Sequence, residues 1–105
     1  MKMTMKDEVH KHRLFITCHQ KGKMYISVSV MKLLGVETGD TVDIGMDNEN
    51  LTVMKGMNYA IGTTHCIHLG TNIRNIGLDQ GRYSFKSWDP DIQMITFEPG
   101  YDYET

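Results

Sequence analysis

The sequence contains one supersecondary pattern twice, and this repeat constrains the fold more than any other feature of the chain. Residues 24–55 contain a strand-like run, a short apolar segment that ends at a glycine, a second glycine and two further strand-like runs, and residues 66–97 follow the same order. Equivalent positions carry similar residues: Leu34 and Ile76, Gly35 and Gly77, Val36 and Leu78, Gly39 and Gly81. A unit of about forty residues is too small to bury a core alone, so the two copies must complete each other.

Each copy predicts a β-β-α-β-β unit with a very short helix. In the first copy we expect strands at 13–18, 24–28, 41–46 and 51–55, with a helix at 29–34 that Ser27 or Ser29 caps and Gly35 ends. In the second copy we expect strands at 58–61, 64–69, 83–86 and 92–97, with a helix at 71–76. The first two strands of each copy are expected to pair as a hairpin. The predicted fold class is therefore mainly β, a small barrel built from two such repeats.

The length of 105 residues is typical of a single domain. We expect a flexible N-terminus at 1–10, one barrel domain at 11–98 with repeats at about 13–55 and 58–97, and an acidic tail at 99–105. The chain contains no apolar run near the roughly 20 residues that a bilayer span needs, and its polar start is unlike a signal peptide. A cytoplasmic protein without membrane contact is expected.

Charge is divided unevenly along the chain. Residues 1–23 carry six cations against two acids, whereas residues 24–105 carry five cations against eleven acids. This separation predicts a positively charged edge on an acidic body. The alternative is that the lysines only keep a frayed N-terminus soluble.

The first copy resembles the AbrB/MazE swapped-hairpin family. The residues that carry the resemblance are Gly22-Lys23 for the family's Gly-Arg, Ile26-Ser27 for Ile-Pro, Leu34-Gly35-Val36 for Leu-Gly-Leu, and Gly39-Asp40 with Val42 and Ile44 for the GD box. Glycine permits a positive φ in the box, and the aspartate can accept backbone N–H bonds that hold the turn. The chain departs from the pattern in three places: Ser27 replaces the proline, Gly81-Arg82 replaces the second Gly-Asp, and the segment from Leu69 to Gly77 is shortened.

The resemblance implies a cradle-loop barrel of the SpoVT-AbrB type and a bacterial or phage transcriptional regulator that binds double-stranded DNA through its basic first hairpin. Family members are homodimers with interlaced halves, so two copies in one chain imply a monomeric pseudo-dimer, with a further homodimer as the alternative. By position, the DNA-binding residues would be Lys11, Arg13, Lys21, Lys23, Lys32 and Arg74. The second copy offers a weaker set, namely His65, His68, Arg74, Arg82 and Lys86.

A different class of function remains open, namely a non-catalytic protein-binding module that inhibits or modulates a partner through an acidic face. The residues after Phe97 are too few for a MazE-type toxin-binding tail.

We expect no cofactor, because no phosphate-binding loop or dinucleotide fingerprint is present. We expect no metal site, because adjacent Cys18-His19 and His65-Cys66 point to opposite faces of a strand. No catalytic residue is predicted, and the two cysteines are interpreted as reduced, buried thiols.

Overall fold

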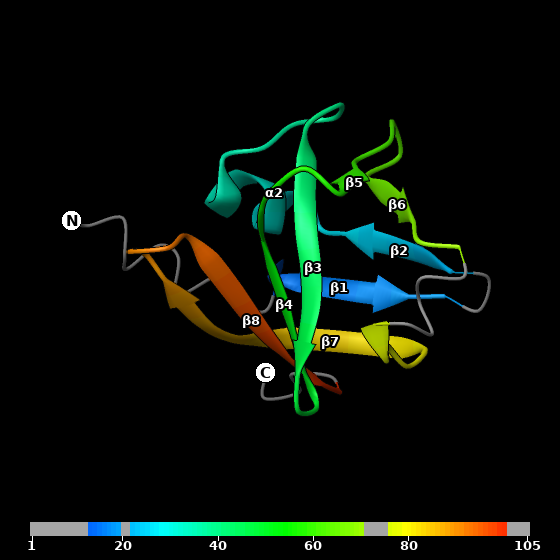
Figure 1. The fold of residues 1–105 in the computed structure, drawn as a ribbon, viewed down its shortest axis with the longest axis vertical. Helices are drawn as coiled ribbons and strands as arrows, with labels where there is room; N and C mark the ends of the chain where they lie inside the picture. The colour runs from blue at the N-terminus through cyan, green and yellow to red at the C-terminus, as the bar shows by residue number, and fades with distance from the viewer. Residues whose placement is uncertain (1–12, 20–21, 71–75, 101–105) are drawn as a thin grey trace.

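The computed structural model describes residues 13–19, 22–70 and 76–100. One antiparallel sheet of eight strands, in the order β5-β3-β4-β8-β7-β1-β2-β6, curls into a small barrel (Figure 1). The elements are β1 (Phe15–Cys18), β2 (Lys23–Ile26), α2 (Val28–Leu34), β3 (Thr41–Asp47), β4 (Asn50–Lys55), β5 (Tyr59–Ala60), β6 (Cys66–His68), β7 (Gly81–Asp89) and β8 (Met94–Pro99). The predicted mainly β barrel is confirmed.

The barrel consists of two half-sheets that enclose the core. One half-sheet contains β7, β1, β2 and β6, and the other contains β5, β3, β4 and β8. In Figure 1, β7, β1 and β2 run side by side, and β3 and β4 cross them. The edge strands β5 and β6 approach each other where the Gly62 N–H donates to the Cys66 carbonyl at 2.8 Å, which nearly closes the barrel. Closure protects strand edges that would otherwise pair with other chains.

Strand pairing follows the sequence repeat. Exchanging β1–β4 with β5–β8 converts β1–β7 into β5–β3, and it leaves β2–β6 and β4–β8 unchanged. It also exchanges the β3–β4 hairpin with the β7–β8 hairpin. Within the β4–β8 ladder Val53 pairs with Ile95, and these two residues are separated by the same offset as Gly35 and Gly77. The chain therefore has the pairing of a pseudo-twofold barrel, except that β5 and β6 lack the ladder that joins β1 and β2.

The core lies between the half-sheets and is filled from both repeats. Its largest fully buried side chains include Phe97, Ile16, Met24, Ile26 and Leu51. Val36 and Leu78, which hold equivalent positions in the two repeats, are 7% and 6% exposed, so both pack into the core.

The helix α2 begins one residue earlier than predicted and ends, as predicted, at Gly35 in the left-handed conformation (φ 74°). The predicted side-chain cap is wrong. Ser27 occupies the N-cap position, but its hydroxyl donates to the Arg13 carbonyl at 2.6 Å and accepts the Phe15 N–H at 3.3 Å. The side chain therefore holds the start of β1 against the end of β2 rather than closing the helix.

The Gly39-Asp40 turn has the predicted structure. Gly39 has φ 97°, and the Asp40 carboxylate accepts the Glu37 N–H at 2.8 Å. The turn is fastened to the second repeat because the Gly39 N–H donates to the Ile61 carbonyl and the Ile61 N–H donates to the Asp40 carbonyl. Asp40 thus fixes the direction in which β3 leaves the turn.

Gly22 is required by a close backbone contact. Its carbonyl accepts the Leu69 N–H at 2.6 Å, and its φ is 74°. A Cβ at this position would lie 2.6 Å from the Gly70 carbonyl oxygen. This contact continues the β2–β6 ladder, so a glycine is needed where the two repeats meet.

The second repeat differs from its predicted form. β5 and β6 are shorter than expected and pair with β3 and β2, instead of forming a ladder with each other. β7 is longer than expected, with a register irregularity between Phe85 and Ser87. Only Ile76 of the predicted helix lies within the described residues. Trp88, near the end of β7, is half-buried against the core.

Candidate nucleic-acid interface

Side chains on the strands alternate between the core and the outer surface, so each half-sheet has an outer face. On β1, Ile16 and Cys18 are buried, whereas Phe15 and Thr17 are half-buried and face outward. We define the basic face as the outward-facing residues of β1, β2 and β6 and of β7 as far as its register irregularity. The exposed residues that flank β1 also belong to it. It comprises Arg13, Phe15, Thr17, His19, Lys23, Tyr25, His68, Arg82 and Lys86, with Ser84 and Cys66 buried within it.

The two half-sheets differ in charge. The described residues of β1, β2 and β6, and those of β7 from Gly81 to Ser87, contain no acid. The strands of the other half-sheet carry Asp43, Asp47 and Glu98 against Lys55. Glu98 borders the basic face, since it pairs with Ser84 across β7 and β8. Among the described residues, charge is therefore divided between two surfaces of one barrel.

The centre of the basic face holds two aromatic rings and a guanidinium. The ring centroids of Phe15 and Tyr25 are 5.9 Å apart with an interplanar angle of 36°. The Arg82 guanidinium carbon lies 3.8 Å from the Phe15 centroid, a cation–π contact. Register explains the cluster, because Thr17 pairs with Tyr25 on one side and with Arg82 on the other.

Cations also lie at both ends of the basic face. At one end, the Phe85 N–H donates to the Leu14 carbonyl at 3.1 Å, so the exposed Lys86 and Arg13 follow at the same end of β7 and β1. At the other end, Lys23 pairs with His68, and the His19 N–H donates to the Lys23 carbonyl at 2.8 Å. With a rise of about 3.3 Å per residue, the face extends roughly 20 Å along β1.

The position of Arg82 depends on a substitution between the repeats. Asp79 is equivalent to Glu37, and Arg82 is equivalent to Asp40. The Asp79 N–H donates to the Tyr83 hydroxyl at 3.2 Å, and that hydroxyl donates back to the Asp79 carbonyl at 3.2 Å. The Tyr83 hydroxyl thus holds this turn in place of a carboxylate. The position equivalent to Asp40 can therefore carry Arg82, whose side chain lies on the outer surface.

The predicted DNA-binding residues divide into three groups. Arg13 and Lys23 lie on the basic face, at opposite ends of the first hairpin. Lys32 is exposed on α2 and borders a separate hollow. Lys11, Lys21 and Arg74 lie outside the described residues. Phe15 and Tyr25 were not predicted as site residues from the sequence, and Arg82 and Lys86 were only in the weaker set.

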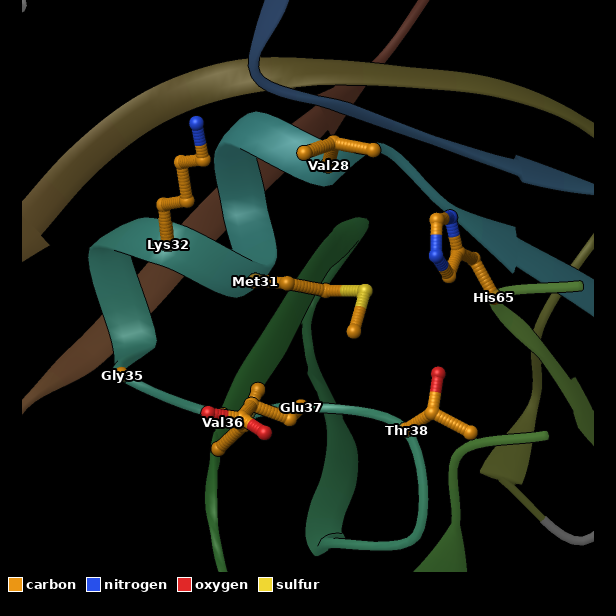
Figure 2. Close-up of a pocket in the computed structure, with 8 residues that line it drawn as sticks. All are labelled: Val28, Met31, Lys32, Gly35, Val36, Glu37, Thr38 and His65. Carbon is orange, nitrogen blue, oxygen red and sulfur yellow. The ribbon is translucent and has the colours of Figure 1, made fainter. Parts of the chain in front are cut away.

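The hollow beside α2 has a volume of about 580 Å³ (Figure 2). In Figure 2, the side chains of Met31, His65 and Thr38 point toward the space between the helix, β6 and the loop after Gly35. Its polar side chains are exposed or half-buried, and none is buried where it would fix the orientation of a ligand. This arrangement provides a less specific site than the basic face.

The titratable core residues are structural. Cys18 and Cys66 are free and buried, as interpreted from the sequence. Burial raises the pKa of the Cys18 thiol to about 12, so it is protonated at neutral pH and is a poor nucleophile. Within the described part of the chain, no three His, Cys, Asp or Glu side chains gather as a metal site. No helix in that part is long and apolar enough to cross a membrane.

Comparisons of the chain with protein-family models, with curated proteins and with solved structures found no match.

Proposed function

We propose that this protein is a non-catalytic DNA-binding transcriptional regulator that contacts phosphates through the basic face. The observation that carries the proposal is the separation of charge between the two outer faces. Arg13, Lys23 and Lys86 are exposed on one half-sheet, whereas the strands of the other carry three acids, Asp43, Asp47 and Glu98. Clustered cations on one surface attract phosphates even when the whole chain has a net charge of −2.

The AbrB-like assignment is part of this proposal. It is supported by the pseudo-twofold strand pairing and by the glycine and aspartate of the first turn, Gly39 and Asp40. An intramolecular pair of repeats would make the barrel complete in one chain, so a monomer is the proposed binding unit. The proposed location is the cytoplasm, where a DNA-binding regulator acts.

The test is the salt dependence of binding to a labelled mixed-sequence duplex, measured by fluorescence anisotropy. We expect Lys23→Glu and Lys86→Glu each to weaken binding and to lower the magnitude of the salt slope by about 1, the effect of one lost phosphate contact. Lys55→Glu is the matched control, because it makes the same charge change at an exposed site on the opposite half-sheet. Equal losses for all three variants, or no binding at low salt, would contradict the proposal.

Protein binding through the opposite outer face is the second candidate function. Met54 pairs with Met94 there, both half-buried, and Met57 in the adjoining loop is 89% exposed. Flexible methionine side chains beside acids suit an adaptable contact with a basic partner. If the duplex does not bind, affinity capture with wild type and a Met57→Ser/Met94→Ser variant tests this function. Capture that survives the substitutions would exclude this face.

A further inference from the structure

We infer that Phe15, Tyr25 and Arg82 form a stacking platform for an unpaired base, so that the basic face prefers single-stranded to duplex nucleic acid. This inference rests on the proposed function and specifies the substrate class of the same surface. It concerns the centre of the face, whereas the phosphate contacts concern its ends.

The geometry of the three side chains supports stacking. The two rings lie 5.9 Å apart, and the guanidinium covers one face of Phe15 at 3.8 Å. Each of the three side chains is half-buried, so the cluster is held by its neighbours while part of it reaches solvent. Aromatic rings and planar guanidinium groups are the two kinds of surface on which proteins stack unpaired bases.

The core of the barrel is filled without the Phe15 and Tyr25 rings. The apolar side chains that fill the barrel on these strands are Ile16, Met24 and Ile26, which alternate with Phe15 and Tyr25. The helix α2 directs its buried residues into the core cluster rather than onto the outer face. Outward aromatics flanked by cations therefore match a ligand that combines flat apolar rings with negative charges.

The distribution of charge matches an extended strand. Arg13 and Lys86 lie beyond one end of the cluster, and Lys23 lies beyond the other. A nucleotide strand that follows β1 would place phosphates at both ends and a base in the middle. The face extends roughly 20 Å, which is less than the about 34 Å of one duplex turn. In a duplex the bases are already stacked and paired, so a duplex can use only the terminal cations.

The experiment compares a labelled oligothymidylate of about sixteen nucleotides with a mixed-sequence duplex, by anisotropy in the same buffer. We expect wild type to bind the single strand more tightly. Phe15→Leu and Tyr25→Leu should weaken single-strand binding by about tenfold and leave duplex binding nearly unchanged. Tyr25→Phe is the conservative control, since it keeps the ring and should keep the affinity. Thermal melts identify any variant that fails to fold.

Arg82→Lys provides a test that does not remove a ring. It keeps the positive charge but loses the planar guanidinium, so stacking predicts weaker single-strand binding, and phosphate contact alone predicts no change. The stacking platform would be overturned if Phe15→Leu, Tyr25→Leu and Arg82→Lys all bound the single strand as tightly as wild type. If the duplex still bound in that case, the proposed function would be unaffected. Absence of duplex binding at low salt would overturn the proposed function itself.

Discussion

Ser27→Ala tests how the start of β1 is held in place. The Ser27 side chain is 4% exposed, and its hydroxyl both donates to the Arg13 carbonyl and accepts the Phe15 N–H. Alanine removes the oxygen and leaves two partly buried backbone groups without this partner. Leaving one buried polar group unsatisfied costs about 1–3 kcal/mol. Because the second bond is long, at 3.3 Å, we expect a total loss of about 2 kcal/mol from the free energy of unfolding.

Urea denaturation followed by circular dichroism measures this loss directly. For a domain of this size, about 2 kcal/mol corresponds to a fall of roughly 8–16 °C in Tm. The matched control is Ser87→Ala, which makes the same chemical change at an exposed strand position and should stay within about 0.5 kcal/mol of wild type. A loss of less than about 0.5 kcal/mol for Ser27→Ala would refute the reasoning, because the hydroxyl bonds would then contribute nothing measurable.

Ser27→Pro introduces the proline that the AbrB/MazE pattern has at this position. The φ of Ser27 is −68° and its ψ is 154°, values that proline adopts without strain. Proline would nevertheless remove the hydroxyl and also the N–H that donates to the Phe15 carbonyl at 3.2 Å. We therefore expect Ser27→Pro to be no more stable than Ser27→Ala. A proline variant more stable than wild type would show that the reduced entropy of the unfolded chain outweighs these bonds.

Two further predictions concern Gly22 and Cys18. Gly22→Ala should lower the free energy of unfolding by more than about 1 kcal/mol in urea melts, since φ is 74° and the new Cβ would meet the Gly70 backbone; an unchanged midpoint would contradict this contact. Stability should fall as pH rises above about 9, by up to about 1.4 kcal/mol per pH unit, because the Cys18 thiol ionises near 9.0 when unfolded but has a pKa of about 12 when folded. Cys18→Ala should flatten this slope around pH 9, where Tyr83, whose pKa burial also raises from 10.0, contributes little; above pH 10 the slope that remains in the variant includes Tyr83.

The sequence was sufficient to predict the repeated frame because its signals are local. A left-handed helix end at Gly35, a turn at Gly39 and an apolar plug at Val36 each depend on a few neighbouring residues. The lengths and partners of β5 and β6 were predicted wrongly because their pairing is set by β3 and β2, which are distant in sequence. The local sequence pattern of a strand does not identify which strand pairs with it in the sheet.

The candidate site was predicted only in part, for a related physical reason. Arg13 and Lys23 were found because cations are visible in the first hairpin, but the stacking of Arg82 on Phe15 needs the register between β1 and β7. One signal was present in the sequence, since Arg82 stands where the family pattern has aspartate. Phe15 gave none, because it lies in the continuous apolar run Leu14-Phe15-Ile16, where pattern alone does not tell an outward side chain from an inward one.

The departure at Arg82 accounts for one of the cations that make the two outer faces unlike. In the first repeat a carboxylate is needed to hold the turn, and Asp40 meets that need by accepting the Glu37 N–H. In the second repeat the Tyr83 hydroxyl takes the equivalent N–H, so position 82 can carry a cation without opening the turn. The frame keeps its pseudo-twofold pairing while its outward residues lose the symmetry. Because Arg13, Lys23, Arg82 and Lys86 gather on the basic face, one chain would present one contact surface, and its proposed target on nucleic acid need not be palindromic.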